Sequence, residues 1–437
     1  MKKTLLALLL LLVSGSLCRA QLPEGSWSGA ITVQGTKLTL VFRFAEDGCK
    51  FDVPDQGLRD LPAEAHLTPL GAIHIDVAAL GASFEGFRMG DKIIGTFTQQ
   101  SVQLPLTLTP GVPVRNRPQT PQPPFPYATE EVSFANGSAV LRGSLTLPEG
   151  FDRSTPVLLM VTGSGLQNRD EELFDHKPFA VIADYLARRG IATLRYDDRG
   201  FGESTGDVVL FTTEDLKEDA AAGMALLRTR FDYVGVLGHS EGGTIALMLA
   251  AEGKADFIVS LAGMVVSGAE TLIAQNRTTL PRLGIDAETT DLYCKALEDT
   301  YAAVIEGLPY PKPADYKLPA ALQQNLGTVQ AQLNVPYLRS MVKLDVSKRL
   351  GQVTCPVLAL NGTRDTQVDA VRNLGALKQG LPASTPNRME FCEGLNHLFQ
   401  HCTTGFSDEY PLIEETFAPE VLILLSTWLE SLRGGWR

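Results

Sequence analysis

A six-residue motif on a strand-to-helix turn is the strongest constraint on how this chain folds. Gly238-His239-Ser240-Glu241-Gly242-Gly243 directly follows the apolar run 233–237 and directly precedes the helical pattern 244–252. Such a turn holds its central residue in a strained backbone, and glycines flank it because side chains there would collide with the neighbouring strand and helix. The motif therefore predicts that the Ser240 hydroxyl projects from the carboxyl edge of a sheet, while His239 is expected to pack.

The chain from residue 128 onward repeats this alternation of strands and helices. Alternation of this kind produces a mostly parallel sheet with helices on both faces, so residues 128–437 are expected to form an α/β domain. Residues 267–348 break the pattern with a long helix-rich stretch, which predicts a helical lid inserted over one edge of the sheet. The expected strands are 157–161, 191–196, 233–237, 257–261 and 357–360, and the expected helices are 179–189, 213–229 and 244–252.

A smaller domain is expected before the α/β domain. Residues 21–109 contain short segments in which apolar and polar residues alternate, without a helical period of useful length, and this pattern predicts a β-rich domain with antiparallel strands. Residues 110–127 contain repeated prolines, which fix extended backbone and predict a semi-rigid linker. A chain of 437 residues, 44% of them hydrophobic, is long and apolar enough for both units.

The first twenty residues have the organisation of a secretory signal. Two lysines precede the apolar run 5–13, and Ala20 ends a suitable cleavage site. The run is far shorter than the ~20 apolar residues that cross a bilayer, which argues against an uncleaved anchor. Leu17 stands where lipid-attachment signals carry a small residue, so lipidation of Cys18 is disfavoured. We therefore expect a signal peptide over 1–20 and a secreted or periplasmic protein without a membrane span.

Charge and cysteine content disfavour several classes of function. The net charge of -12 gives no general attraction for nucleic-acid phosphates, so nucleic acid is not an expected partner. The sequence has no CxxC pair, no HExxH helix and only six histidines, so no metal site is expected. Six cysteines less Cys18 leave five, an odd number, and the pair with the shortest loop is Cys392 with Cys402. The alternative to a disulfide there is that these cysteines are small buried side chains.

Ser240 needs a histidine and a carboxylate to act as a nucleophile. The imidazole takes the hydroxyl proton, and the carboxylate orients the imidazole. Only His397 and His401 follow Ser240 in the chain, and His397 is favoured because it lies just past a strand-like segment. Asp365 follows an apolar strand and should emerge at the same sheet edge as Ser240, which favours it over Asp369.

Two backbone N–H groups must stabilise the oxyanion of a tetrahedral intermediate, typically by ~3 kcal/mol each. Glu241, which follows the nucleophile, is expected to supply one of them. The loop 162–166 after an earlier strand should supply the other, with Ser164 as the expected donor and Gly165 as the alternative. Dinucleotide binding by the glycines of this loop is disfavoured because Asn168 occupies the place of the third glycine.

Five segments of the chain resemble the α/β-hydrolase superfamily, namely 163–171, 197–204, 238–243, 361–365 and 395–400. More specifically, nearly the whole mature chain resembles the secreted bacterial serine carboxylesterases that carry a β-rich domain before the hydrolase domain. The resemblance implies an α/β-hydrolase fold, a Ser240–Asp365–His397 triad and esterase activity without a cofactor. The turn at 198–204 is expected to be structural. Thr162 departs from the family pattern, since many relatives have histidine there, and this affects only the second oxyanion donor.

These observations predict a secreted serine carboxylesterase whose substrate is a small-molecule or glycan-linked ester. Ser240 should form an acyl-enzyme that water hydrolyses. A thioesterase acting on acyl-CoA is disfavoured because secretion separates the enzyme from CoA. A serine peptidase acting on small substrates is disfavoured because such peptidases usually carry a much larger propeller domain. A non-catalytic glycan-binding module has no use for an activated nucleophile.

Overall fold

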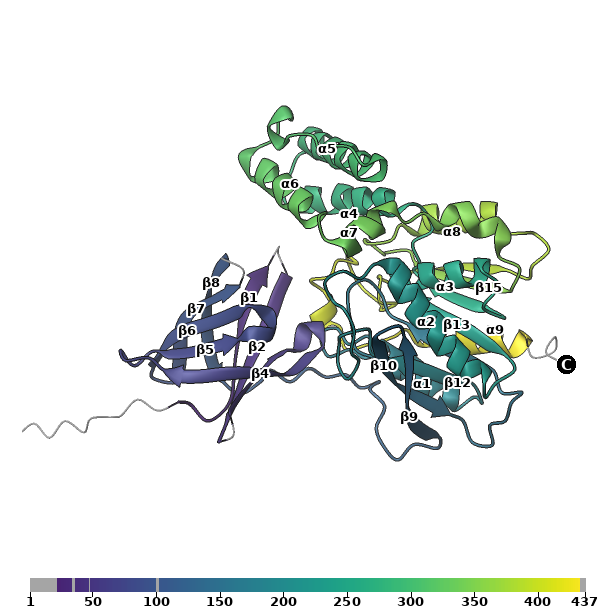
Figure 1. Cartoon of the computed structure of the whole chain (residues 1–437), viewed down its shortest axis with the longest axis horizontal. Helices are drawn as coiled ribbons and strands as arrows, with labels where there is room; N and C mark the ends of the chain where they lie inside the picture. The colour runs from purple at the N-terminus through teal and green to yellow at the C-terminus, as the bar shows by residue number, and fades with distance from the viewer. Residues whose placement is uncertain (1–21, 34–35, 47, 100–101, 433–437) are drawn as a thin grey trace, which may run out of the picture. The chain divides into compact units, whose positions relative to one another are not determined.

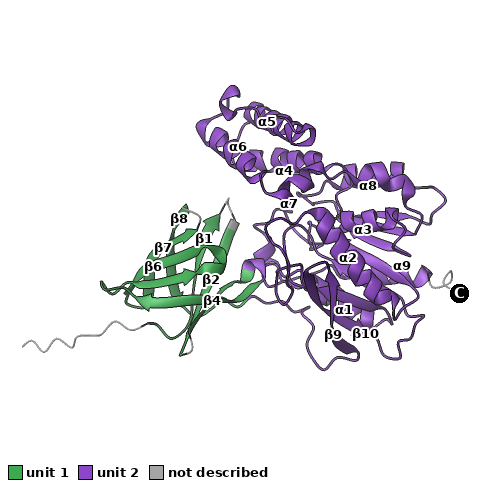
Figure 2. Cartoon of the chain, in the orientation of Figure 1, with its two compact units in different colours: residues 1–54, 58–114 green, residues 55–57, 115–437 purple. Residues whose placement is uncertain are grey.

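The computed structural model describes residues 22–33, 36–46, 48–99 and 102–432. The expected signal peptide lies outside the described residues. The chain forms two compact units, one within residues 1–54 and 58–114 and the other within residues 55–57 and 115–437 (Figure 2). Within the described ranges, no helix combines the length and apolar content needed to cross a membrane.

The first unit is a closed antiparallel barrel of the strands β1 to β8, in which β1 pairs with both β2 and β8. Closure removes the free edges that make isolated sheets prone to aggregate. Side chains alternate between the inside and the outside of the barrel: in β5, residues 73, 75 and 77 are buried, whereas 74 and 76 are not. Phe42 packs inside against Phe51 and Phe84, with ring centroids 5.0 and 5.7 Å apart. The strands are β1 (Gly25–Val33), β2 (Thr36–Ala45), β3 (Gly48–Val53), β4 (Leu58–Leu67), β5 (Ile73–Val77), β6 (Ala82–Met89), β7 (Lys92–Gln99) and β8 (Val102–Pro110).

The second unit is built on an eight-stranded mixed sheet with the order β16-β15-β14-β13-β11-β12-β10-β9. The strands from β16 to β12 run parallel, whereas β9 and β10 form an antiparallel hairpin at one edge. This hairpin is not among the strands expected from the sequence. The strands are β9 (Ala128–Asn136), β10 (Ala139–Leu147), β11 (Val157–Val161), β12 (Ala192–Tyr196), β13 (Val234–His239), β14 (Ile258–Leu261), β15 (Val357–Gly362) and β16 (Arg388–Cys392).

Helices cover both faces of this sheet (Figure 1). All five residues of β11 are buried; Leu159 faces the core shared with α2, α3 and α8, while Leu158 and Met160 face the core shared with α1 and α9. A strand buried on both faces is a continuous apolar run, which is why the sequence predicts the central strands well. The helices are α1 (Pro178–Ala187), α2 (Thr213–Arg228), α3 (Glu241–Ala251), α8 (Ala370–Gly380) and α9 (Pro419–Leu432). The expected α/β fold is confirmed.

Between β14 and β15 the chain forms four further helices, which we call the lid. They are α4 (Gly268–Arg282), α5 (Ala287–Glu306), α6 (Ala320–Gln332) and α7 (Pro336–Lys343). Tyr293, Leu297 and Leu326 form part of a separate apolar core within the lid. Tyr337 of α7 instead packs with the core of the sheet, so α7 joins the lid to the rest of the unit.

Part of the stretch expected to be a linker is hydrogen-bonded to the second unit. Arg117 donates to the carbonyl oxygens of Phe174 and Ile413, each at 2.8 Å. Gln119 donates to the carbonyl oxygen of Phe417 at 2.7 Å. The proline-rich backbone from Arg115 therefore lies on the surface of the α/β unit.

The five cysteines in the described part of the chain are free thiols. Four of them are buried, and Cys402 is partly exposed. Burial raises the pKa of the Cys392 thiol to about 12. Within the described ranges, no group of three or more His, Cys, Asp or Glu side chains is arranged to hold a metal ion.

Candidate active site

Ser240 lies on the sharp turn between β13 and α3. Its backbone has φ 52° and ψ −117°, a strained conformation for a residue with a side chain. The Ser240 N–H donates to the carbonyl oxygen of Leu261 at 2.8 Å, which ties the turn to β14. A Cβ atom at Gly238 would collide with the carbonyl of Gly242, and one at Gly242 would collide with the carbonyl of Val161. The glycines of the motif are therefore needed for steric reasons.

Asp365 and His397 form a buried pair. The Nδ1 atom of His397 lies 2.8 Å from Oδ2 of Asp365, which also accepts a hydrogen bond from Asn361 Nδ2 at 3.0 Å. Oδ1 of Asp365 accepts the N–H groups of Gln367 and Val368 at 2.8 and 2.9 Å. Both oxygens of Asp365 therefore accept hydrogen bonds. A neutral His397 that donates from Nδ1 has its lone pair on Nε2, so the ring can take a proton there.

The structure gives the two alternative residues, Asp369 and His401, hydrogen-bond partners outside this pair. Asp369 is the N-cap of α8 and accepts the N–H of Arg372 at 2.8 Å. His401 is exposed and pairs with Glu415 at 2.9 Å. Each alternative therefore has a local structural partner of its own.

His239 connects the loop that carries His397 to the turn that carries Ser240. Its Nε2 atom donates to the carbonyl oxygen of His397 at 2.9 Å, and the centroids of the two rings are 4.7 Å apart. Because His239 directly precedes Ser240, the His397 loop lies against the turn. The structure thus gathers Ser240, Asp365 and His397 at the carboxyl ends of β13, β15 and β16.

The loop after β11 presents three consecutive N–H groups. That of Gly163 donates to Glu171 Oε1 at 2.7 Å, and that of Gly165 donates to Tyr337 Oη at 2.8 Å. The Ser164 N–H between them has no acceptor among the described residues. Of the two donors considered from the sequence, Ser164 is therefore the one left available, and Gly165 is committed to the lid.

Glu241 contributes the first N–H of α3, which has no partner within its own helix. Its side chain is buried and accepts hydrogen bonds from Thr213 Oγ1 at 2.7 Å and from Tyr337 Oη at 2.6 Å. Burial raises the pKa of this carboxyl, and the hydroxyl donors oppose that effect. Tyr337 therefore links helix α7 of the lid to both backbone segments that carry the expected oxyanion donors.

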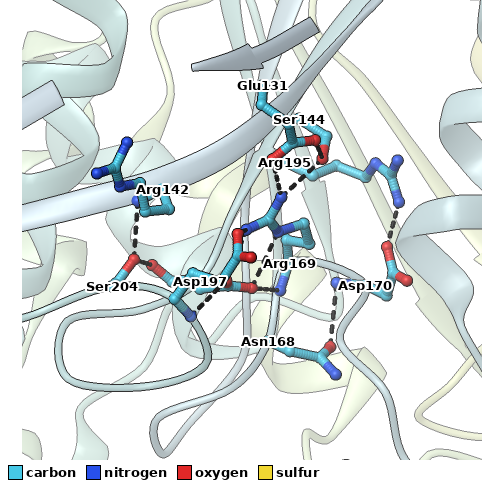
Figure 3. A network of polar contacts seen from close by, with 10 residues as sticks. Glu131, Arg142, Ser144, Asn168, Arg169, Asp170, Arg195, Asp197 and Ser204 are labelled. Carbon is cyan, nitrogen blue, oxygen red and sulfur yellow. Dashed lines mark hydrogen bonds and ion pairs between the residues drawn. The ribbon is translucent and has the colours of Figure 1, made fainter. Parts of the chain in front are cut away.

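Arg169 anchors the same loop to the turn after β12 (Figure 3). Its guanidinium binds both carboxylate oxygens of Asp197, at 3.1 and 2.8 Å, and also contacts Ser144 and Glu131. Ser204 Oγ donates to the backbone carbonyl of Asp197 at 2.7 Å. The contacts within the turn at 198–204 and with Arg169 are thus those of a structural support for the loop after β11, which we call the oxyanion loop because it carries the expected donor Ser164.

Thr162 also binds this turn. Its hydroxyl donates to Oδ2 of Asp198 at 2.8 Å, and the N–H of Gln167 donates to the same oxygen at 2.8 Å. Burial raises the pKa of Asp198 to about 8, although both hydrogen bonds act to lower it. The carboxyl is therefore protonated in the folded protein at pH values where it would be ionised in the unfolded chain.

The shifted pKa of Asp198 predicts a pH-dependent stability. The carboxyl binds its proton more tightly in the folded state. Its contribution to the free energy of unfolding is therefore complete below about pH 4 and is lost as the pH rises through about 8. Each tenfold difference in proton affinity between the folded and unfolded states changes the free energy of unfolding by about 1.4 kcal/mol. In Asp198→Asn, the decline in unfolding free energy between pH 4 and 8 should be shallower than in the wild type. Denaturant unfolding at several pH values measures this, and parallel profiles would contradict it.

Comparison with known proteins places this site in a family. Residues 176–400, more than half of the chain, match the family model described as "Serine aminopeptidase, S33". The chain belongs to this family. It is therefore an α/β hydrolase, in agreement with the order of its sheet and with its serine-bearing turn. The family model includes Ser240, Asp365 and His397 within its range but begins after the loop that contains Ser164.

Individual relatives match a smaller part of this chain or have low sequence identity to it. The esterase EstD of Thermotoga maritima is 36% identical over 124 residues, which are 28% of this chain and 30% of that esterase. The match thus spans under a third of the length of that relative. The Pyrococcus furiosus esterase PF2001 is 15% identical with a TM-score of 0.44, covering 74% of this chain and 98% of its own. Proline iminopeptidase of Mycobacterium smegmatis is 16% identical with a TM-score of 0.43, covering 70% and 100%.

Proposed function

We propose that this hydrolase is a serine carboxylesterase that forms an acyl-enzyme on Ser240. The observation that carries the proposal is the buried Asp365–His397 pair, whose loop lies against the strained turn of Ser240. In the first half-reaction, Ser240 Oγ attacks the ester carbonyl while His397 Nε2 takes the hydroxyl proton. His397 then gives this proton to the departing alcohol, and the acyl group stays on Ser240.

Water completes the cycle with the same groups. His397 takes a proton from water, which attacks the acyl-enzyme and releases the carboxylic acid. In both half-reactions the tetrahedral intermediate carries an oxyanion, which the N–H groups of Ser164 and Glu241 would stabilise. The buried carboxylate of Asp365 keeps His397 in the useful tautomer and stabilises the imidazolium that forms.

An ester fits the site better than a peptide with a free amino terminus, although the family description names an aminopeptidase. An aminopeptidase needs an acidic group to bind the substrate ammonium. Glu241, the carboxylate next to the nucleophile, is buried and already accepts hydroxyl donors, among them Thr213 and Tyr337. The relative EstD is named an esterase, which also supports an ester as substrate.

A series of nitrophenyl esters from acetate to long acyl chains tests the proposed function, with aminoacyl nitroanilides measured alongside. We expect ester hydrolysis with an optimum in acyl length and little release of nitroaniline. Hydrolysis of the nitroanilides without that of the esters would favour the peptidase instead. We also propose export of the protein, with a small-molecule or glycan-linked ester as substrate; N-terminal sequencing of the exported protein should begin at Gln21.

The contacts of Tyr337 predict that the lid influences catalysis. Tyr337→Phe keeps the ring that stacks on Phe211, 4.8 Å between centroids, but removes both hydrogen bonds of the hydroxyl. Leaving a buried acceptor without its donor costs about 1–3 kcal/mol. Because the two bonds hold the oxyanion donors, we expect kcat to fall by about tenfold with little change in KM. Steady-state kinetics on the best nitrophenyl ester measures this.

A second lid tyrosine provides the control for that variant. Tyr293 is buried in the core of the lid. Its hydroxyl donates to Asn325 of α6, whereas that of Tyr337 bonds to Gly165 and Glu241. Tyr293→Phe should therefore lower the melting temperature without lowering kcat. If both variants lose kcat equally, the lid acts through its general stability and the specific role of Tyr337 is wrong.

A further inference from the structure

A second histidine–carboxylate pair lies directly beneath the nucleophile. The side chains of His239 and Glu171 are buried, with 8% and 5% of their surfaces exposed. The Nδ1 atom of His239 lies 2.9 Å from Glu171 Oε1, and its Nε2 atom donates to the carbonyl oxygen of His397 at 2.9 Å. The catalytic scheme above uses neither side chain, although both touch segments that it depends on.

Glu171 connects this pair to the oxyanion loop. The same Oε1 atom accepts the N–H of Gly163 at 2.7 Å, one residue before Ser164. The backbone of Glu171 has φ 52°, a conformation that residues with side chains rarely adopt. A Cβ atom at Gly163 would lie 3.3 Å from both Glu171 Oε1 and the Cβ atom of Ser240, so the three residues are closely packed. The carboxylate thus fixes the loop against the nucleophile.

The contacts of the ring indicate that His239 is charged. Nε2 faces a carbonyl oxygen, and Nδ1 faces a carboxylate oxygen that already accepts an N–H group. Two acceptors require a proton on each nitrogen, which is the imidazolium form. Burial lowers the pKa of His239, but the adjacent Glu171 outweighs burial and the pKa is raised. The pair is therefore an ion pair with charge-assisted hydrogen bonds, which are stronger than neutral ones.

We propose that Glu171 and His239 are positioning residues that hold the oxyanion loop and the general base in register around Ser240. The chain of contacts runs from Gly163 through Glu171 and His239 to the backbone of His397. This inference rests on the proposed esterase function. Misplacement of a catalytic group by ~1 Å can lower the rate by ~10²-fold. The pair should therefore affect the chemical step more than substrate binding.

Glutamine at position 239 or 171 can remove one contact of this chain while keeping another. In His239→Gln, the amide nitrogen can occupy the place of Nε2 and keep the bond to His397, while the bond to Glu171 is lost. In Glu171→Gln, the side-chain oxygen can still accept the N–H of Gly163, while the ion pair is lost. Both variants remove the same ion pair. We therefore expect each variant to lower kcat by ~10- to 100-fold and to keep KM within ~3-fold of the wild-type value. The kcat of the double variant should lie within ~3-fold of the kcat of the less active single variant.

A purely structural role would give a different result, because unfolding lowers the number of active sites and not the rate at each site. Sites are therefore counted with a fluorophosphonate probe that labels nucleophilic serines, and kcat is given per labelled site. His176 provides the control: it is buried, and its Nε2 also donates to a backbone carbonyl, that of Tyr410, at 3.0 Å. His176→Gln should lower the melting temperature and leave kcat per site unchanged.

The outcomes separate this inference from the proposed function. A loss of kcat per site in both single variants, with no further loss in the double variant, supports the positioning role. Unchanged kcat per site, or losses that multiply in the double variant, would overturn it while leaving the esterase intact. If the wild-type protein labels at no serine and hydrolyses no ester, the proposed function fails and the inference falls with it.

Discussion

Ser240→Ala is expected to lower kcat on the best nitrophenyl ester by about 10⁴- to 10⁶-fold. The alanine methyl group cannot attack a carbonyl, so the covalent route is lost and only binding and oxyanion stabilisation remain. The fold should be kept, because the strained turn depends on the glycines around position 240 and on the bond from its N–H to Leu261. Kinetics and a melting curve of the purified variant measure the two effects separately.

A buried serine elsewhere provides the control for this variant. Ser426 lies on α9, where its hydroxyl donates to the carbonyl oxygen of Ile423 at 3.1 Å. Ser426→Ala should keep wild-type kcat and lose only a little stability. Turnover by Ser240→Ala near the wild-type rate would show that another residue is the nucleophile.

Asp365→Asn should have the second largest effect, a fall in kcat of about 10⁴-fold. The asparagine oxygen can still accept the N–H groups of Gln367 and Val368. Its NH₂ group then faces Nδ1 of His397, which must accept instead of donate. The proton moves to Nε2, where it prevents the imidazole from taking the serine proton.

Asp369 tests whether this effect is specific. Asparagine caps a helix about as well as aspartate, so Asp369→Asn should keep the N-cap of α8 and the wild-type kcat. A large loss in Asp369→Asn together with a small loss in Asp365→Asn would reverse the assignment of the acid.

Much of the sheet could be predicted from the sequence because its central strands are buried on both faces. The run 157–161 is apolar throughout, and the strand forms over those same residues. Strand β9 carries no comparable signal, because it is mostly exposed and has only one buried residue, Phe134. Closure of the barrel depends on the pairing of β1 with β8, more than 80 residues apart, which alternation within single strands does not encode.

The residues of the candidate site also differ in how well the sequence predicts them. Ser240, Asp365 and His397 follow strands or precede a helix, so local pattern and chain order are enough to propose them. The roles of His239 and Tyr337 depend on partners far away in the sequence, Glu171 and Glu241. The sequence predicts only packing for His239, whereas both of its ring nitrogens are hydrogen-bonded. The acidic segment 170–172, next to the oxyanion loop, was the only signal that could have suggested its partner.

The most direct test of the account is to trap the acyl-enzyme. The wild-type protein is mixed with nitrophenyl acetate, quenched with acid during turnover and digested, and the acetyl group is located by mass spectrometry. The account predicts acetyl on the peptide that carries Ser240, and none on the same peptide of Ser240→Ala. Acetyl on a different residue during full turnover, or a burst of nitrophenol that persists in Ser240→Ala, would contradict it.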